Sequence, residues 1–74
     1  MNEFLTKFID LFDDTDPTEI QMNTRFRDLD EWSSLLGLSV ILMADEEYGV
    51  TIGATDIKSA LTVEDLYNVI LSKK

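Results

Sequence analysis

The stretch of sequence that decides the fold runs from residue 33 to residue 49 and reads SSLLGLSVILMADEEYG. It opens on two serines, and serine is a preferred residue at a helix N-cap because its hydroxyl accepts a hydrogen bond from a free backbone N–H. It closes on Gly49, which suits the left-handed conformation that often ends a helix. The stretch therefore predicts a helix that begins at Ser33 or Ser34 and stops before Gly49.

Apolar residues fill most of this helix, so its inward face is harder to assign. Leu38, Ile41 (or Leu42) and Tyr48 have the spacing of a core-facing stripe. Gly37 lies in the interior, where glycine costs about 1 kcal/mol relative to alanine. We therefore expect Gly37 to mark a close approach between elements.

A second helical pattern precedes this stretch, in residues 2–13. Its apolar positions repeat with the period of an amphipathic helix, which predicts one buried stripe. The stripe consists of Phe4, Phe8 and Phe12 with Leu5 and Ile9 beside them.

A third helical pattern closes the chain. Thr62 followed by Asp65 resembles a capping box, in which each residue bonds the other's backbone N–H. Lys73 and Lys74 come at the carboxyl end, where the helix dipole favours cations. The apolar stripe of this helix is Val63, Leu66, Tyr67 and Ile70.

The connections between these helices are uneven in length. Pro17 ends the first helix and begins a long loop, whose apolar residues Ile20, Met22, Phe26 and Leu29 should fasten it to the core. The acidic run around Pro17 lacks the glycine of an EF-hand loop and has a proline inside it, so we expect a solvated loop and no metal site. Residues 50–52 are too short for a confident strand, and residues 56–60 predict a short helical turn with Ile57 facing inward.

These patterns together predict an all-α fold. It is a small bundle of three main helices plus one short helix, with a long loop between the first and second helices. The chain has 74 residues, too few for a second core, so residues 1–74 should form a single domain.

The composition excludes several classes of function. The chain has no cysteine and no histidine, which removes thiolate and imidazole chemistry and argues against an enzyme. Its formal net charge of −9 disfavours nucleic acid and anionic membranes and favours partners with basic docking surfaces. No signal peptide or membrane span is evident, so we expect a cytoplasmic monomer.

Four features in register resemble the acyl carrier protein family, and together they cover essentially the whole chain. Ser34-Leu35 matches the end of the family's Asp-Ser-Leu triplet, with Leu29 and Trp32 upstream as in the family. The acidic, aromatic and Val-x-Ile exit of the second helix matches residues 45–52. The opening of the last helix, residues 62–66, resembles the family's Thr-Val-x-x-Leu.

The resemblance implies that Ser34 carries 4′-phosphopantetheine, transferred from coenzyme A by a phosphopantetheinyl transferase. The prosthetic thiol then holds an acyl group as a thioester for biosynthetic enzymes, such as those of fatty acid or polyketide synthesis. By the same analogy Leu35, Leu42, Asp45 and Glu46 meet partner enzymes. A buried, purely structural Leu42 is the alternative reading.

The chain departs from the family at Ser33, where the family has aspartate. Ser33 still suits a helix cap but carries no charge, and it is itself a second candidate for the attachment point; register with Leu35 favours Ser34. This departure leaves two other readings open. One is an unmodified carrier-like module that docks one partner through Leu35, Leu36 and Leu42; the other is an acidic mimic of nucleic acid.

Overall fold

The structure is a computed structural model that describes residues 3–74. Its helices follow in the order α1 (Glu3–Ile9), α2 (Ser34–Tyr48), α3 (Ala54–Ser59) and α4 (Val63–Lys73). Two short 3-10 turns, η1 (Pro17–Glu19) and η2 (Phe26–Asp28), lie in the connection between α1 and α2. No strand occurs in residues 3–74, so the all-α prediction is confirmed.

Helix α1 is shorter than the sequence predicts. The predicted residue Asn2 lies outside the described residues, and the helix ends at Ile9 instead of reaching Asp13. After Ile9 the backbone tightens, because the N–H groups of Leu11 and Phe12 donate to carbonyls only three residues back. The predicted stripe nevertheless faces the core: Phe4, Phe8, Phe12 and Leu5 are buried and Ile9 packs against them.

An aromatic cluster holds α1 against the loop and the start of α2. The ring of Phe8 contacts Phe26 at 5.8 Å between centroids, and Phe26 meets Trp32 edge-on at 4.9 Å. At the other end of α1, Phe4 stacks on Tyr67 of α4 at 5.0 Å. One short helix therefore packs against both the connection that leads to α2 and the last helix.

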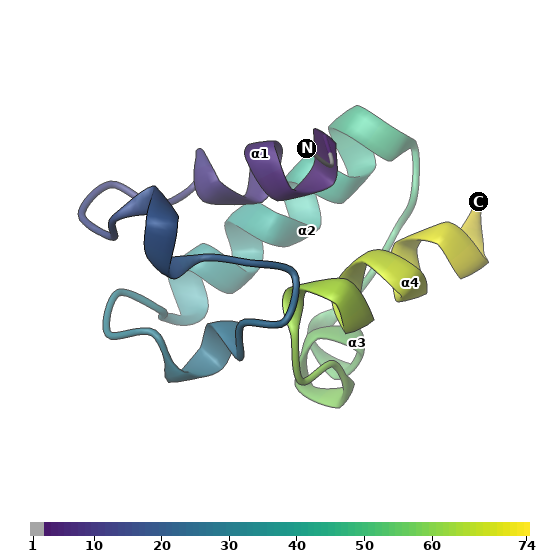
Figure 1. Ribbon diagram of the computed structural model, residues 1–74. Helices are drawn as coiled ribbons and strands as arrows, with labels where there is room; N and C mark the ends of the chain where they lie inside the picture. The colour runs from purple at the N-terminus through teal and green to yellow at the C-terminus, as the bar shows by residue number, and fades with distance from the viewer. Residues whose placement is uncertain (1–2) are drawn as a thin grey trace.

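The long connection is fastened to the core as predicted. Ile20 and Phe26 are fully buried, and Met22 and Leu29 pack against the core cluster. The loop also receives the first turn of α4, whose free N–H groups at Val63 and Glu64 donate to loop carbonyls at 3.1 and 2.8 Å. Figure 1 shows this segment passing in front of α2 and meeting the start of α4.

The face that α2 turns inward matches the prediction only in part. Leu36, Gly37, Val40, Met43 and Ala44 are buried. Of the predicted stripe, Ile41 and Tyr48 pack against the core, whereas Leu38 and Leu42 are half exposed. A helix that is apolar all round has no preferred face of its own, so its neighbours choose. Here the side chains of Trp32 and Ile57 lie against Gly37, and the ring of Phe4 in α1 lies 6.0 Å from that of Tyr48.

Both ends of α2 match the sequence signals. Ser33 is the N-cap, and its Oγ accepts a hydrogen bond from the N–H of Leu36 at 3.4 Å. Gly49 adopts the left-handed conformation (φ 65°), and its N–H donates to the carbonyls of Ala44 and Asp45. Helix α2 is thus bounded where its sequence places it, even though its orientation is not.

The last two helices pack together below α2 in Figure 1. Helix α3 begins two residues earlier than predicted, because the N–H of Gly53 donates to the Asp56 carboxylate at 3.0 Å and starts the turn there. Ile57 faces inward as predicted, and Val50 and Ile52 are buried without forming a strand. Helix α4 has the predicted reciprocal capping between Thr62 and Asp65.

Candidate functional site

The site centres on Ser34, the first residue of α2. Ser34 is exposed, and Ser33 immediately before it caps the helix. Because the first N–H groups of a helix lack partners within it, an anionic ester on this hydroxyl would meet free donors and the positive end of the helix dipole. The hydroxyl is therefore accessible and its surroundings suit a phosphate.

Beside Ser34 an open groove of about 530 Å³ runs between α2 and α3. Its surface is mainly apolar. Ser34, Leu38 and Ile41 contribute one wall, since residues four and three apart follow one side of a helix. The floor and opposite wall come from Trp32, Gly37, Ala54 and Ile57, and two cations, Arg27 and Lys58, complete the lining.

Gly37 leaves space in this groove, although an alanine would also fit at this position. A Cβ added there would lie 3.7 Å from the ring of Trp32 and 3.9 Å from the side chain of Ile57, which is ordinary van der Waals contact. The structure therefore does not require glycine at this position, and the predicted close approach between elements is wrong in that respect. A larger side chain at this position would instead occupy the groove.

Helix α2 carries a second feature, an exposed row that runs away from Ser34. Leu35 is 72% exposed and Leu42 is 51% exposed, and Glu46 continues the same side one turn further on. Asp45 is also exposed and flanks the row. A buried, structural Leu42 is therefore excluded, and the four residues expected to meet partners share one accessible surface.

The docking surface of the alternative module needs one correction. Leu36 is only 9% exposed and belongs to the core, so it cannot present itself to a partner. Leu38, which was expected inside, is 52% exposed and replaces it on the surface. Leu36 is buried and Leu38 is exposed because α2 turns a partly different face to the core from the one that the sequence predicts.

Glu31 ties the segment before α2 to residues 13–15 of the connection that follows α1, a role that no sequence pattern indicated. Its carboxylate accepts the N–H groups of Asp13, Asp14 and Thr15 at 2.7, 3.0 and 2.8 Å, together with the Thr15 hydroxyl at 2.7 Å. The Thr15 hydroxyl and these N–H groups hold the pKa of the Glu31 carboxyl below its ordinary value. The backbone N–H groups of the acidic run thus donate to the carboxylate of Glu31.

Other titratable groups in the described chain serve local structure. A backbone N–H and the hydroxyl of Thr18 lower the pKa of Asp16, which caps η1. Burial raises the pKa of Tyr48, whose ring lies under Lys74 at 5.5 Å. Within residues 3–74 no group of three or more carboxylates converges on a possible metal position.

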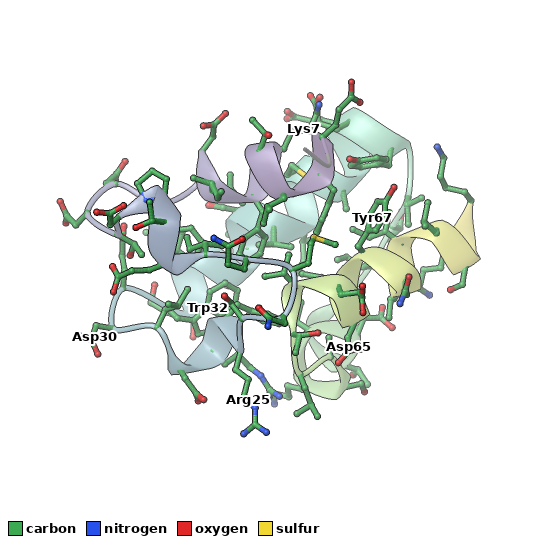
Figure 2. All side chains as sticks on the ribbon, viewed as in Figure 1. Lys7, Arg25, Asp30, Trp32, Asp65 and Tyr67 are labelled. Atoms are coloured by element: carbon green, nitrogen blue, oxygen red, sulfur yellow. The ribbon has the colours of Figure 1, made fainter. Side chains whose placement is uncertain are left out.

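Figure 2 shows Trp32 near the centre of the view and Arg25 projecting from the lower edge of the molecule. Sequence reasoning missed Arg27 and Lys58 as residues of the groove beside Ser34. They come from η2 and α3, and no spacing along the chain connects them with Ser34.

Comparisons with protein-family models, with curated proteins and with solved structures found no match for this chain. Among residues 3–74, no helix has both the length and the apolar character needed to span a membrane.

Proposed function

We propose that this chain is an acyl carrier protein, modified at Ser34 by 4′-phosphopantetheine. The observation that carries the proposal is the placement of Ser34: exposed, first in a capped helix and on the rim of an apolar groove. The resemblance of residues 29–35, 45–52 and 62–66 to the carrier family supports it. The protein supplies the attachment point, and the attached thiol supplies the reactive sulfur that holds an acyl group as a thioester.

The modification is a phosphoryl transfer that needs no base from this chain. The Ser34 Oγ forms a bond to the phosphorus next to the pantetheine of coenzyme A, and the bond from that phosphorus to 3′,5′-ADP breaks. The hydroxyl proton goes to the transferase, which also activates the oxygen. This division of labour suits a protein without histidine or cysteine.

Partner enzymes would be recognised along the exposed side of α2. Leu35 and Leu42 provide an apolar contact near Ser34, and Asp45 and Glu46 provide charge at the far end. The distance along the helix from Leu35 to Glu46 is about 16 Å at 1.5 Å per residue. A partner with an apolar patch beside a basic one fits this order, and such a docking contact should weaken only in part at high salt.

Intact-mass spectrometry tests the proposal directly. The wild-type protein incubated with coenzyme A and a broad-specificity transferase should gain the mass of one phosphopantetheine. Ser34→Ala should abolish the gain. Ser33→Ala, the matched control that removes the neighbouring hydroxyl, should keep it.

Two results would overturn the proposal. One is no gain by the wild-type protein under conditions that modify a known carrier. The other is a gain that survives Ser34→Ala and disappears in Ser33→Ala, which would move the attachment point by one residue.

A second candidate function, an unmodified interaction module, is favoured by the uncharged Ser33 and by the exposed row of Leu35, Leu38 and Leu42. In that case the native protein should have its unmodified mass. Leu35→Asp should abolish partner binding while leaving the melting temperature unchanged. Detection of the phosphopantetheinylated form in cells excludes this candidate.

A further inference from the structure

The cations of this acidic chain are unevenly distributed. Six lysines and arginines face fifteen carboxylates. Lys7 pairs with Glu47 at 3.6 Å, Lys73 pairs with Asp56 at 3.8 Å, and Lys74 lies over a tyrosine ring. The remaining three, Arg25, Arg27 and Lys58, have no carboxylate within 4.0 Å in residues 3–74.

Two of these three cations line the groove beside Ser34. Arg27 comes from η2 and Lys58 from the last turn of α3, so they reach the groove from different elements. The guanidinium of Arg27 is held in place because its Nη2 donates to the carbonyl of Ala60 at 3.0 Å. An arginine has five N–H donors, so others stay available for an anion.

The surroundings of this pair favour an anion over a cation. Trp32, Gly37 and Ile57 form an apolar floor, next to which a charge interaction is screened less than in open water. Arg27 and Lys58 together give this part of the surface a positive character on a molecule of net charge −9. Phosphate esters suit such a pair, because arginine binds them through paired N–H groups and lysine binds them as a point charge.

We propose that Arg27 and Lys58 form a phosphate-binding rim of the α2–α3 groove, which holds the phosphodiester carried by Ser34. This inference rests on the proposed function for the source of the phosphate. A free phosphate ester from solution has the same chemistry and is the competing source. The two residues act by binding and orienting the phosphate and take no part in bond making.

Trp32 is the chain's single tryptophan and lines the same groove, which makes it a reporter of the local charge. In the unmodified protein, anionic iodide should quench Trp32 fluorescence more strongly than cationic caesium, against the sign of the net charge. Lys58→Glu should reverse this order. Lys7→Glu changes the net charge by the same two units at a residue of α1 that does not line the groove. This variant should keep the wild-type order, with iodide the stronger quencher.

Charge reversal at Lys58 should be tolerated by the fold because Lys58 is exposed. Lys58→Arg keeps the charge and should behave as the wild type, which separates a charge effect from a structural one. Stronger quenching by caesium in the unmodified wild-type protein would overturn the phosphate-binding rim.

The modified protein provides the second half of the test. Once Ser34 carries the phosphodiester, iodide quenching of Trp32 should fall by about twofold or more, since a unit negative charge a few ångströms away changes local ion concentration by at least that factor. The difference between modified and unmodified protein should shrink in Lys58→Glu and persist in Lys7→Glu. An unchanged iodide quenching constant after modification would refute the proposal.

The proposed function can fail separately. If Ser34 cannot be modified, the experiment on the unmodified protein still decides whether the rim attracts anions. Added inorganic phosphate then serves as the probe. If millimolar phosphate then reduces the iodide quenching of Trp32, the rim binds a free phosphate ester, and the assignment to Ser34 is overturned. If phosphate leaves the quenching unchanged, the rim is not a phosphate site.

Discussion

Helices α2 and α4 are both defined by capping signals in the sequence, yet they differ in what decides their orientation. In α4 the apolar residues Val63, Leu66 and Ile70 form one stripe, and all three are fully buried. In α2 three of the four leucines, Leu35, Leu38 and Leu42, are exposed, and only Leu36 is buried. An amphipathic helix such as α4 therefore specifies its own inward face, whereas the inward face of a helix that is apolar all round is set by the elements packed against it.

The largest effect should come from two adjacent leucines of α2 that differ in burial. Leu36→Ala removes a core side chain and should lower the free energy of unfolding by about 2–3 kcal/mol. Leu35→Ala removes a side chain that is 72% exposed and should change it by less than about 0.5 kcal/mol. Urea unfolding followed by circular dichroism measures both. Equal costs would mean that α2 is rotated from the orientation described here.

Removing the N-cap of either helix should lower the free energy of unfolding by less than Leu36→Ala, and the two caps should differ in their cost. Thr62 and Asp65 bond each other's backbone N–H groups at 3.2 Å, and Thr62→Ala should cost about 1 kcal/mol. The single bond at Ser33 is longer, 3.4 Å, so Ser33→Ala should cost only about 0.5 kcal/mol. Thermal unfolding of the two variants gives the order. A costlier Ser33→Ala would show that α2 depends on its cap more than α4 does.

Gly37→Ala should stabilise the protein by up to about 0.8 kcal/mol, because alanine is the better helix former and the groove accepts its methyl group. The measurement is the midpoint of urea unfolding. In α4, which contains no glycine, the analogous substitution does not exist. A lower midpoint would contradict the ordinary contacts of 3.7 and 3.9 Å on which this expectation depends.

The smallest effect concerns Glu31, which supports the start of α2 from outside the helix. Its pKa is depressed in the folded state, so its contribution to stability is present above the unfolded value, near 4.5, and is lost as the pH falls through the folded pKa. Glu31→Gln should therefore lower the melting temperature at pH 7 and converge with the wild type in acid. A difference that stays constant from pH 7 to pH 3 would count against this role.

Hydrogen exchange locates the effect of Glu31→Gln along the chain. Amides of residues 13–15, which donate to this carboxylate, should lose protection. Amides at the start of α4 should keep theirs, since that helix has its own capping residues. Equal loss at both sites would indicate general destabilisation and no local role.

Much of the fold followed from short-range signals. The aromatic stripe of α1 and the caps of α2 and α4 rest on spacings of eight residues or fewer, whereas the apolar anchors of the loop were predicted from their composition alone. Such signals predict an element and its ends, because helix hydrogen bonds and caps join residues close in sequence. They predicted the end of α1 poorly, because the backbone tightens into three-residue hydrogen bonds at Leu11 and Phe12.

The candidate site divides in the same way. Ser34, its cap and the acidic end of α2 could be recognised along the chain. The groove could not, because Arg27, Trp32 and Lys58 reach it from separate elements, and because the exposure of Leu38 depends on how α2 is rotated.

The amino-acid order was enough to set the helical class, the limits of α2 and the capped, amphipathic α4, since each depends on local backbone hydrogen bonding and periodic burial. Long-range packing chose the inward face of α2 and brought two cations to the groove beside Ser34. The physical reason is that burial is shared between elements: where a helix is apolar on every side, its own sequence ranks no face above another, and contacts with α1, α3 and the long loop make the choice.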